Sequence, residues 1–494
     1  MINFIIVLVA TALCFILKYQ WQNRRLVKMM NAFDGPPALP VVGNALTFVC
    51  STKEILRRGL SIMAQYKNPI RIWLFHIPYV AITDPEDFQI VSMKALEKDD
   101  GYRFLADLIG DGLITAKVSK WKKNRKIIAP IFSRIILYHH YLDIFNKQSL
   151  KLVETLEQEI SHGKQFDAWL YIFKTFFNII SETAMGYSKD FDNMETLAKL
   201  KDSTTKASLL AGQRFYQPWL QPSIIFKIYT FMKGWSNVFE ESKAVPLKIL
   251  KLKREKFLEE KSNNVTKEEK SYNSFIDILM NTHEAKHFTD EDVADEVLTI
   301  MFAATETSAL ITSFALLMLA MHPQIQEKVY EELRETFENS DRPMTTDEIN
   351  KLTFLDQCIK ETLRLFAAVP VVIRHTYEDL PISNGRVIPA GANIILAIFG
   401  VHQNENLYPN PKVWNPYNFD ADKVAARHPC AFVPFGVGPR MCIGYKQSMV
   451  AITTLLATVL RKFKLSTDET EYELDVDFLI RSARGFNIRL EHRN

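Results

Sequence analysis

The most informative stretch of the sequence is Pro434-Phe435-Gly436-Val437-Gly438-Pro439-Arg440-Met441-Cys442-Ile443-Gly444. It is a loop rich in proline and glycine that contains one cysteine, and an apolar segment follows it directly. In that segment Met449, Ile452, Leu456 and Val459 recur at spacings of three and four, which predicts a helix with one buried face. Cys442 therefore lies just before a helix N-terminus, where the partial positive charge and free N–H groups lower a thiol pKa and favour a metal-binding thiolate.

A second apolar segment, from Val293 to Met321, contains neither proline nor glycine. Its length and apolarity would suit a membrane span. However, Thr305-Glu306-Thr307-Ser308 lies at its centre, and a carboxylate at mid-membrane is costly and rare. We therefore expect a long helix buried in a large core, with its polar cluster as a candidate functional site.

The N-terminus has the pattern of a membrane anchor. Residues 1–17 are almost all apolar, and Lys18, Arg24, Arg25 and Lys28 follow them. A cleaved leader would carry its positive charges first, so this order predicts a retained anchor with the protein body on the cytoplasmic side. At about 1.5 Å per residue the apolar run is roughly 26 Å long, close to the thickness of the hydrocarbon core.

The chain divides into three expected regions. Residues 1–21 form the anchor, and residues 22–44 form a basic, proline-rich linker. Gly35-Pro36-Pro37 in that linker predicts a stiff extended connector, because consecutive prolines cannot continue a helix. Residues 45–494 form one catalytic domain.

The catalytic region is expected to be mainly α-helical with a small β region. Short β-branched stretches at Ile70–Phe75 and Tyr79–Thr83 predict strands, and helical patterning dominates from about residue 120. The 494 residues include 60 basic and 57 acidic side chains, so the net charge of +3 gives no signature of nucleic-acid binding. No phosphate-binding glycine motif follows a predicted strand. The chain is thus expected to bind neither nicotinamide nor flavin, and any electrons must come from another protein.

The five cysteines, at 14, 50, 358, 430 and 442, show no repeated spacing, which argues against a disulfide framework. The His428-x-Cys430 dyad near Cys442 raises the alternative of a membrane-anchored zinc protein. Zinc sites usually show two close pairs of ligands, whereas only one pair stands here.

The pattern Phe435-x-x-Gly438-x-Arg440-x-Cys442-x-Gly444 resembles the haem-binding loop of the cytochrome P450 superfamily. Within that superfamily the chain is similar to the family 4 clan and its insect relatives, through 182–186 (ETAMG) and 214–220 (RFYQPWL). The resemblance implies the P450 fold, with the Cys442 thiolate as axial iron ligand. A thiolate ligand favours cleavage of the O–O bond.

The resemblance also implies a structural scaffold. Glu361-Thr362-Leu363-Arg364 resembles the Glu-x-x-Arg pair of the family, and residues at i and i+3 share one helix face. The segment from Tyr408 to Phe419 resembles the family's meander. Many members have an arginine where this chain has Asn418, so we expect fewer charges in the scaffold.

Further residues are assigned to the haem by resemblance. Trp121 and Arg125 match the family's Trp-x-x-x-Arg helix, and Arg374 and Arg440 match its other basic haem contacts. Haem has two propionates, and buried carboxylates need paired hydrogen-bond donors. Phe435 and Gly444 complete the expected haem-binding set.

The polar cluster at 303–308 resembles the family's oxygen-binding segment, with Glu306 and Thr307 as its acid–alcohol pair. A hydroxyl linked through water to an acid can relay protons while the pocket stays dry. Ala304 replaces a glycine that is often found there. Ala303 replaces a glutamate that esterifies the haem in related fatty-acid ω-hydroxylases, so a non-covalent haem b is expected.

The resemblance places the substrate among mainly apolar residues, which implies a lipophilic substrate such as a fatty acid, a hormone-like lipid or a xenobiotic. The substrate-contacting residues expected are Phe104, Leu113, Phe215, Ala303, Val369, Val372 and Ile480.

The expected activity is monooxygenation: one atom of O2 enters the substrate and the other leaves as water. The resemblance implies electrons from NADPH–cytochrome P450 reductase, with cytochrome b5 as a further candidate donor, and a location in the endoplasmic reticulum membrane. Lys122, Lys123, Lys126 and Lys446 are candidates for docking an acidic donor. Two alternatives remain: a haem-thiolate isomerase or dehydratase, which Glu306 and Thr307 disfavour, and a non-catalytic haem carrier or lipid-binding protein.

Overall fold

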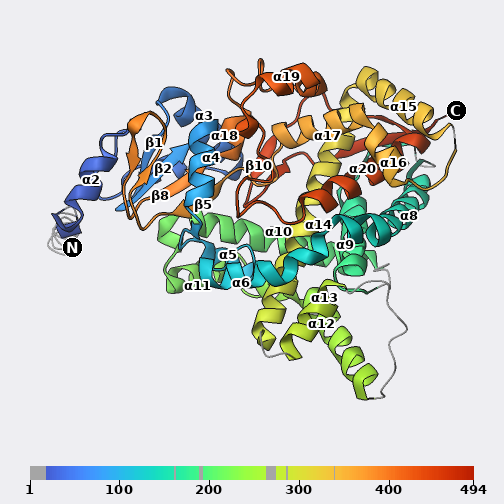
Figure 1. The fold of residues 1–494 in the computed structure, drawn as a ribbon, viewed down its shortest axis with the longest axis horizontal. Coiled ribbons are helices and arrows are strands. Elements are labelled where there is room, and N and C mark those ends of the chain that lie inside the picture. The colour runs from blue at the N-terminus through green and yellow to red at the C-terminus, as the bar shows by residue number, and fades with distance from the viewer. Residues whose placement is uncertain are drawn as a thin grey trace.

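The computed structural model describes residues 18–19, 21–160, 163–187, 193–262, 274–284, 288–338 and 340–493. Figure 1 shows a small sheet beside the N-terminal helix α2 and a larger helical region that fills the rest of the molecule. The fold is therefore mainly α with a small β region, as the sequence predicts. The apolar run of the predicted anchor, residues 1–17, lies outside the described residues.

The α-helices have the following bounds: α2 Arg24–Met30, α3 Thr52–Gln65, α4 Pro85–Lys94, α5 Tyr102–Ile109, α6 Val118–Ile128, α7 Arg134–Ile136, α8 Leu142–Ile160, α9 Trp169–Thr183, α10 Met194–Tyr216, α11 Ser223–Met232, α12 Val238–Ser262, α13 Phe275–Glu284, α14 Asp290–Met321, α15 Pro323–Phe337, α16 Thr346–Lys351, α17 Thr353–Leu365, α18 Ile398–His402, α19 Ala421–Ala426 and α20 Tyr445–Lys462.

The largest sheet has the strand order β1 (Ile70–Leu74), β2 (Ile77–Ile82), β8 (Asn393–Leu396), β5 (Val372–His375) and β3 (Glu97–Lys98). Strands β2 and β8 are parallel and the other neighbours are antiparallel. The smaller sheets comprise β10 (Leu474–Val476) with β11 (Ile480–Ser482), β6 (Leu380–Pro381) with β7 (Val387–Ile388), and β4 (Phe166–Asp167), β12 (Asn487–His492) and β9 (Phe463–Ser466). Strands β1 and β2 confirm the two predicted strands.

Helix α14 runs through the centre of the helical region (Figure 1). It begins with a capping box in which Thr289 and Asp292 each bond to the other's backbone N–H, and its first turn is acidic, which suits the helix dipole. It is the one described helix that is long and apolar enough to cross a membrane, and 78% of its most apolar window is buried. The expectation of a core helix is confirmed.

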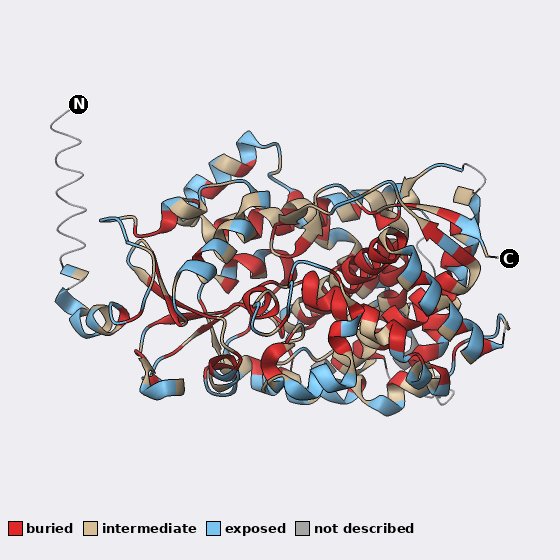
Figure 2. Ribbon diagram, turned by 90° about the horizontal axis from the view of Figure 1, so that it is seen from above, coloured by how far each residue is buried: buried red, intermediate tan, exposed pale blue. Residues whose placement is uncertain are grey.

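Helix α20 packs against this core with the predicted face. Ile452, Leu456 and Val459 are completely buried. The buried residues, red in Figure 2, concentrate along the central helices. At the end of α17, the ring of Phe366 stacks on Phe314 of α14 with 4.1 Å between centroids. Helices α14, α17 and α20 thus form one continuous core.

The segment predicted as a linker packs against the sheet instead of standing apart from it. Met30 is completely buried and Phe33 is 9% exposed, within a core cluster shared with strand residues. The Asp34 carbonyl accepts a hydrogen bond from Arg71 N at 2.7 Å. These apolar side chains find a buried surface on the sheet. Residues 35–38, within the predicted extended connector, adopt neither helix nor strand.

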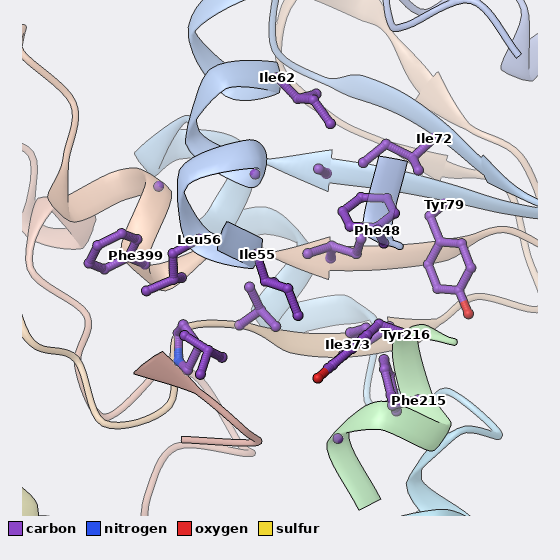
Figure 3. A pocket seen from close by; sticks show the side chains of 18 of the residues that line it. Phe48, Ile55, Leu56, Ile62, Ile72, Tyr79, Phe215, Tyr216, Ile373 and Phe399 are labelled. Carbon is purple, nitrogen blue, oxygen red and sulfur yellow. The ribbon is translucent and has the colours of Figure 1, made fainter. Parts of the chain in front are cut away.

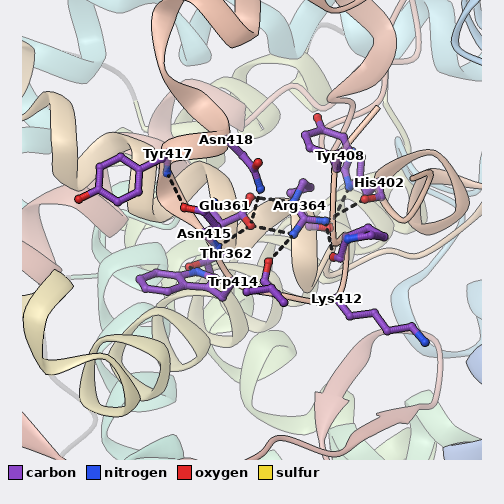
Figure 4. Close-up of polar contacts among 12 residues, drawn as sticks. Glu361, Thr362, Arg364, His402, Tyr408, Lys412, Trp414, Asn415, Tyr417 and Asn418 are labelled. Atoms are coloured by element: carbon purple, nitrogen blue, oxygen red, sulfur yellow. Dashed lines mark hydrogen bonds and ion pairs between the residues drawn. The ribbon is translucent and has the colours of Figure 1, made fainter. Parts of the chain in front are cut away.

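A buried ion pair on α17 joins several loops (Figure 4). Arg364 donates to both Glu361 oxygens at 2.7 Å, and both side chains are completely buried. Arg364 also donates to the carbonyl oxygens of His402, Pro411 and Val413 at 2.9, 2.8 and 3.2 Å. The predicted scaffold pair therefore holds the meander against α17.

Asn418 replaces the expected charge with a hydrogen bond. Its Nδ2 donates to Glu361 Oε1 at 3.1 Å, and the backbone N–H of Asn415 donates to the same oxygen at 2.8 Å. Both acceptor oxygens of Glu361 are therefore satisfied without a cation at position 418.

His402 links this scaffold to the cysteine loop. Its Nε2 accepts a hydrogen bond from Val433 N at 2.9 Å, so its Nδ1 carries the proton and donates to the Arg364 carbonyl at 3.2 Å. Burial, with repulsion from Arg364, lowers the pKa of His402 to about 3, which keeps the ring neutral. Val433 directly precedes the loop that carries Cys442.

Replacing Arg364 with Ala should lower the free energy of unfolding by about 3–5 kcal/mol, because Glu361 then stays buried without its cation. The matched control is Lys360→Ala on the same helix, where an exposed pair with Asp356 is lost and the change should stay below about 0.5 kcal/mol. Urea unfolding followed by circular dichroism measures both changes. Equal midpoints for the two variants would contradict the scaffold role.

Candidate active site

The loop before α20 folds back on itself. Cys442 N donates to the Phe435 carbonyl at 2.9 Å and closes the loop. Gly436 and Gly438 have φ of +69° and +77°, a region that side chains rarely adopt, and a Cβ at Gly438 would lie 2.8 Å from the Ser92 carbonyl oxygen. The loop therefore requires glycine at these turns, and Gly444 is the N-cap of α20.

Cys442 has accessible surface and yet lies within the protein body. The residue is exposed, while desolvation by the surrounding protein raises the pKa of its thiol. Surface that is accessible and also desolvated belongs to an internal space. The expected fall in the thiol pKa is not found, because burial outweighs the opposing effects of the Gly444 N–H and Arg125.

The middle of α14 borders an internal space in the same way. Ala303, Ala304 and Thr307 are partly exposed although Thr305 and Glu306 beside them are buried. These three residues share one helix face, since they stand at i, i+1 and i+4.

A contact between α14 and α20 fixes that face relative to the cysteine loop. Ser308 Oγ lies 3.1 Å from Ser448 Oγ, and Ser448 N donates to the Gly444 carbonyl at 2.9 Å. The predicted oxygen-binding segment and the predicted iron ligand are thus brought to neighbouring elements.

A cluster of basic side chains lies where strands β3 and β5 pair. Lys98 is directly opposite Arg374, so two like charges share one face of the sheet. Desolvation, with repulsion from Arg374, lowers the pKa of Arg440 to about 10, and Glu97 opposes this shift only in part. Desolvation, with repulsion from Arg374 and Arg440, also holds the pKa of Lys98 well below its usual range. Such a cluster is unfavourable unless an anion joins it.

The arginines of this cluster have hydrogen-bond donors to spare. The Arg440 guanidinium lies 4.1 Å from the centre of the Trp121 ring and donates to the carbonyls of Leu96 and Ala116, each at 3.1 Å. Arg440 Nη1 and Arg374 Nε are buried and have no partner among the described residues. Carboxylates are the groups that such donors pair with best.

Haem carries the negative charges that these basic residues could pair with. Its two propionates would supply the anions that Lys98, Arg374 and Arg440 lack. Arg125 lies within electrostatic reach of both Cys442 and Arg440, so the thiol and the cations border one site. A bound iron would also hold the sulfur as a thiolate, whatever the pKa of the free thiol.

Glu306 is held by the C-terminal hairpin. Its Oε2 accepts a hydrogen bond from Arg481 Nη1 at 2.9 Å, and Arg481 Nε donates to Asp477 Oδ2 at 2.5 Å. Burial raises the pKa of Glu306, and Arg481 opposes that shift. Glu306 Oε1 is buried and without a partner among the residues the structure describes. Thr307 Oγ1 donates to the Ala303 carbonyl at 2.7 Å.

The residues expected to contact the substrate lie in several different environments. Phe215 lines a large apolar cavity (Figure 3), and Val369 and Val372 are partly exposed. Leu113 is 8% exposed, and its backbone N–H donates to the buried Glu296. Ile480 is completely buried.

Phe104 is also buried. It is 3% exposed, and the Arg214 guanidinium lies 4.4 Å from the centre of its ring. Of the predicted substrate residues, Phe215 is the one that lines this cavity.

Two residues of the site escaped the sequence analysis. Lys98 belongs to the site because β3 pairs with β5. Arg481 belongs to it through hydrogen bonds to Glu306 and Asp477, which lie 175 and 4 positions away in the sequence. A strand of two residues such as 97–98 gives no local signal, whereas Arg481 lies near the predicted Ile480.

No group of three or more metal-ligating side chains is found among the described residues. His428 Nδ1 accepts a hydrogen bond from Cys430 N at 3.0 Å, and Cys430 is 3% exposed. In the His428–Cys430 pair that suggested zinc, His428 therefore stabilises a backbone turn and Cys430 packs in the core.

Comparison with known proteins agrees with this geometry. A family model described as Cytochrome P450 matches residues 34–484. Cytochrome P450 4c3 of Drosophila melanogaster is 30% identical, with 99% of this chain and 94% of that protein covered. Cytochrome P450 4V2 of Homo sapiens is also 30% identical, covering 96% and 91%.

An insect relative outside the flies matches as well. Cytochrome P450 4c21 of Blattella germanica is 30% identical over 92% of each chain. The names of these relatives confirm the similarity to family 4 and to its insect members. The chain therefore belongs to the cytochrome P450 family and is a P450 monooxygenase.

Proposed function

We propose that this monooxygenase inserts one atom of O2 into a lipophilic substrate with electrons from an external NADPH-dependent reductase. The observation that carries the proposal is the site geometry: the Cys442 thiol and the open face of α14 border internal space beside an uncompensated cluster of basic side chains. When bound, haem supplies oxygen activation, which a thiolate ligand promotes.

The residues that would hold the haem b are Cys442 at the iron and Arg125, Arg374 and Arg440 at the propionates, with Lys98 added by the structure. Trp121, Phe435 and Gly444 complete the set. Ala303 has no carboxyl group, so we propose non-covalent binding. Extraction with acidified acetone tests this, since a haem esterified to the chain would stay with the polypeptide.

Glu306 and Thr307 are proposed to move protons to the site. Beside Glu306 lies a cavity of about 30 Å³ whose lining includes Thr204, Ser242 and Thr305. It is large enough for a water molecule, and these hydroxyls could bind one. Glu306 Oε1, which lacks a partner among the described residues, would accept a proton from that side, and Thr307 would present it to the site.

We infer that the protein is attached to a membrane, in the endoplasmic reticulum with its catalytic domain in the cytoplasm. Helix α11 supports this, because Ile224, Ile228, Phe231 and Met232 are between 55% and 79% exposed. A cluster of exposed apolar side chains on one helix is typical of contact with a lipid surface. The proposed domains are the anchor at 1–21, the linker at 22–44 and the catalytic domain at 45–494. Protease protection in microsomes tests the orientation.

Electrons are proposed to arrive through the basic surface formed by Lys122, Lys123, Lys126 and Lys446. The first three are exposed on α6, the helix that also carries Trp121 and Arg125. An acidic flavoprotein, or cytochrome b5, that binds there would lie close to the haem edge.

Replacing Cys442 with Ala should abolish the strongly red-shifted Soret band of the dithionite-reduced, carbon-monoxide-treated protein, because the thiolate ligand is lost. Cys430→Ala is the matched control: its buried side chain lies 12 residues earlier and should leave the band in place. A band that survives in Cys442→Ala, or one typical of histidine ligation in the native protein, would show that the ligand is misassigned.

Replacing Glu306 with Gln should reduce product formed per O2 consumed by about 10–100-fold, because general acid catalysis in the site is lost. Glu291→Gln, on the exposed first turn of the same helix, should leave the ratio unchanged. Oxygen uptake and product, with methyl laurate as the probe lipophile, give the ratio. An unchanged ratio in Glu306→Gln would exclude the proposed proton path.

Reversing charge at Lys122 and Lys126 together should raise the reductase concentration for half-maximal NADPH oxidation by about three- to tenfold at low salt. Lys251→Glu, on the remote surface of α12, serves as the control. The difference should shrink at high salt, because surface electrostatics are screened. Identical kinetics for both variants would rule out this docking surface.

A further inference from the structure

A large apolar cavity opens beside the main sheet (Figure 3). It has a volume of about 190 Å³ and is bordered by α3, by strands of the main sheet, by the end of α10 and by the C-terminal hairpin. Among the described residues that line it there is no lysine, arginine or histidine. The polar side chains in the lining are Tyr79, Tyr102, Tyr216 and Asp477.

Three of these four polar side chains have partners within the protein. Tyr79 donates to Asp99 at 3.5 Å, and Tyr102 Oη accepts from Ile373 N at 3.2 Å. Asp477 Oδ1 accepts from Leu479 N at 2.6 Å and its Oδ2 accepts from Arg481 at 2.5 Å. Tyr79 and Asp477 therefore have little hydrogen-bonding capacity left for a ligand, and Tyr102 already accepts one hydrogen bond from the backbone.

The hydroxyl of Tyr216 differs from the others. Its oxygen is buried, and it has no hydrogen-bond partner in the part of the chain that the structure describes. Tyr216 is the last residue of α10, and that helix is held tightly against the hairpin. At Gly212, one turn earlier, a Cβ would lie 2.5 Å from the Asp477 carbonyl oxygen. The hydroxyl is thus fixed in an apolar lining, and a ligand that bonds to it removes an unsatisfied polar group.

The lining around Tyr216 excludes one kind of ligand. Burial, with repulsion from Asp477 and Asp475, raises the pKa of the Tyr216 hydroxyl well above its usual range. Asp477 is paired with Arg481, so the main obstacle to a carboxylate ligand is a different one: a buried carboxylate needs a cation, and the described lining contains none. An uncharged oxygen does not meet this obstacle, and the tyrosine can donate to it.

We propose that this cavity binds a neutral lipophile with one uncharged oxygen, such as an ester, ketone, ether or alcohol, which hydrogen-bonds to the Tyr216 hydroxyl. A free fatty acid in its ionised form is excluded by the same chemistry. The inference rests on the proposed function insofar as the bound lipophile is the substrate, and it narrows the substrate class that the family resemblance leaves open.

Equilibrium dialysis against the haem-loaded full-length chain tests the proposal with three probes of similar length: methyl laurate, laurate and tridecane. Methyl laurate should bind more tightly than laurate at neutral pH. Tyr216→Phe removes only the hydroxyl and should weaken methyl laurate about three- to tenfold, the effect of one hydrogen bond, without changing tridecane.

Tyr229→Phe is the matched control, because its hydroxyl lies outside the cavity lining and already donates to Gln213 at 3.0 Å. It should leave the affinity for methyl laurate unchanged. The proposal is overturned if laurate binds as tightly as methyl laurate, if none of the three probes binds, or if Tyr216→Phe does not discriminate ester from alkane.

The carbon-monoxide spectrum of the same preparations separates this inference from the proposed function. If the Soret band is red-shifted as expected and laurate binds tightly, the proposed ligand class is wrong and the proposed monooxygenase function still holds. If that band is absent, the proposed monooxygenase function is wrong. The dialysis then still shows which ligands the cavity binds.

Discussion

Glu361 and Arg364 are both completely buried, and each satisfies the other as well as the backbone of a distant loop. Two charges in such a place are stable only as a fully bonded set, so the meander must take one arrangement around them. His402 connects the meander to the cysteine loop, because it hydrogen-bonds to Arg364 on one side and to Val433 on the other. The position of the cysteine loop therefore depends on an ion pair that has no part in the chemistry.

The basic cluster shows the opposite situation, a set of charges that the protein leaves incomplete. Lys98 and Arg374 face each other across two strands, and Arg440 adds a third positive charge. In the scaffold every oxygen of Glu361 has a donor, whereas buried donors of Arg374 and Arg440 lack partners among the described residues. The scaffold pair is thus fully bonded, whereas the cluster proposed to hold the haem keeps unpaired donors.

Much of this could be predicted from the sequence where the signal is contiguous. The loop at 434–444, the long helix α14 and the buried face of α20 are each visible within one short stretch, and the structure confirms them. Lys98 and Arg481 were missed because their surroundings come from strands and helices far away in the chain. The burial of Met30 could not be predicted for a similar reason, since nothing within residues 22–44 indicates that the sheet offers this side chain a buried surface.

The ligand recognition and the proton supply proposed for this protein both involve the guanidinium of Arg481. Asp477 lines the apolar cavity and bonds to Arg481, and Arg481 bonds to Glu306 on α14. A substitution at Arg481 would therefore unpair one buried carboxylate in the proposed proton path and another in the cavity wall, and loss of activity would not tell the two apart. Tyr216 has no bond to either carboxylate among the described residues, so its hydroxyl is the point at which ligand recognition can be separated from the chemistry at α14.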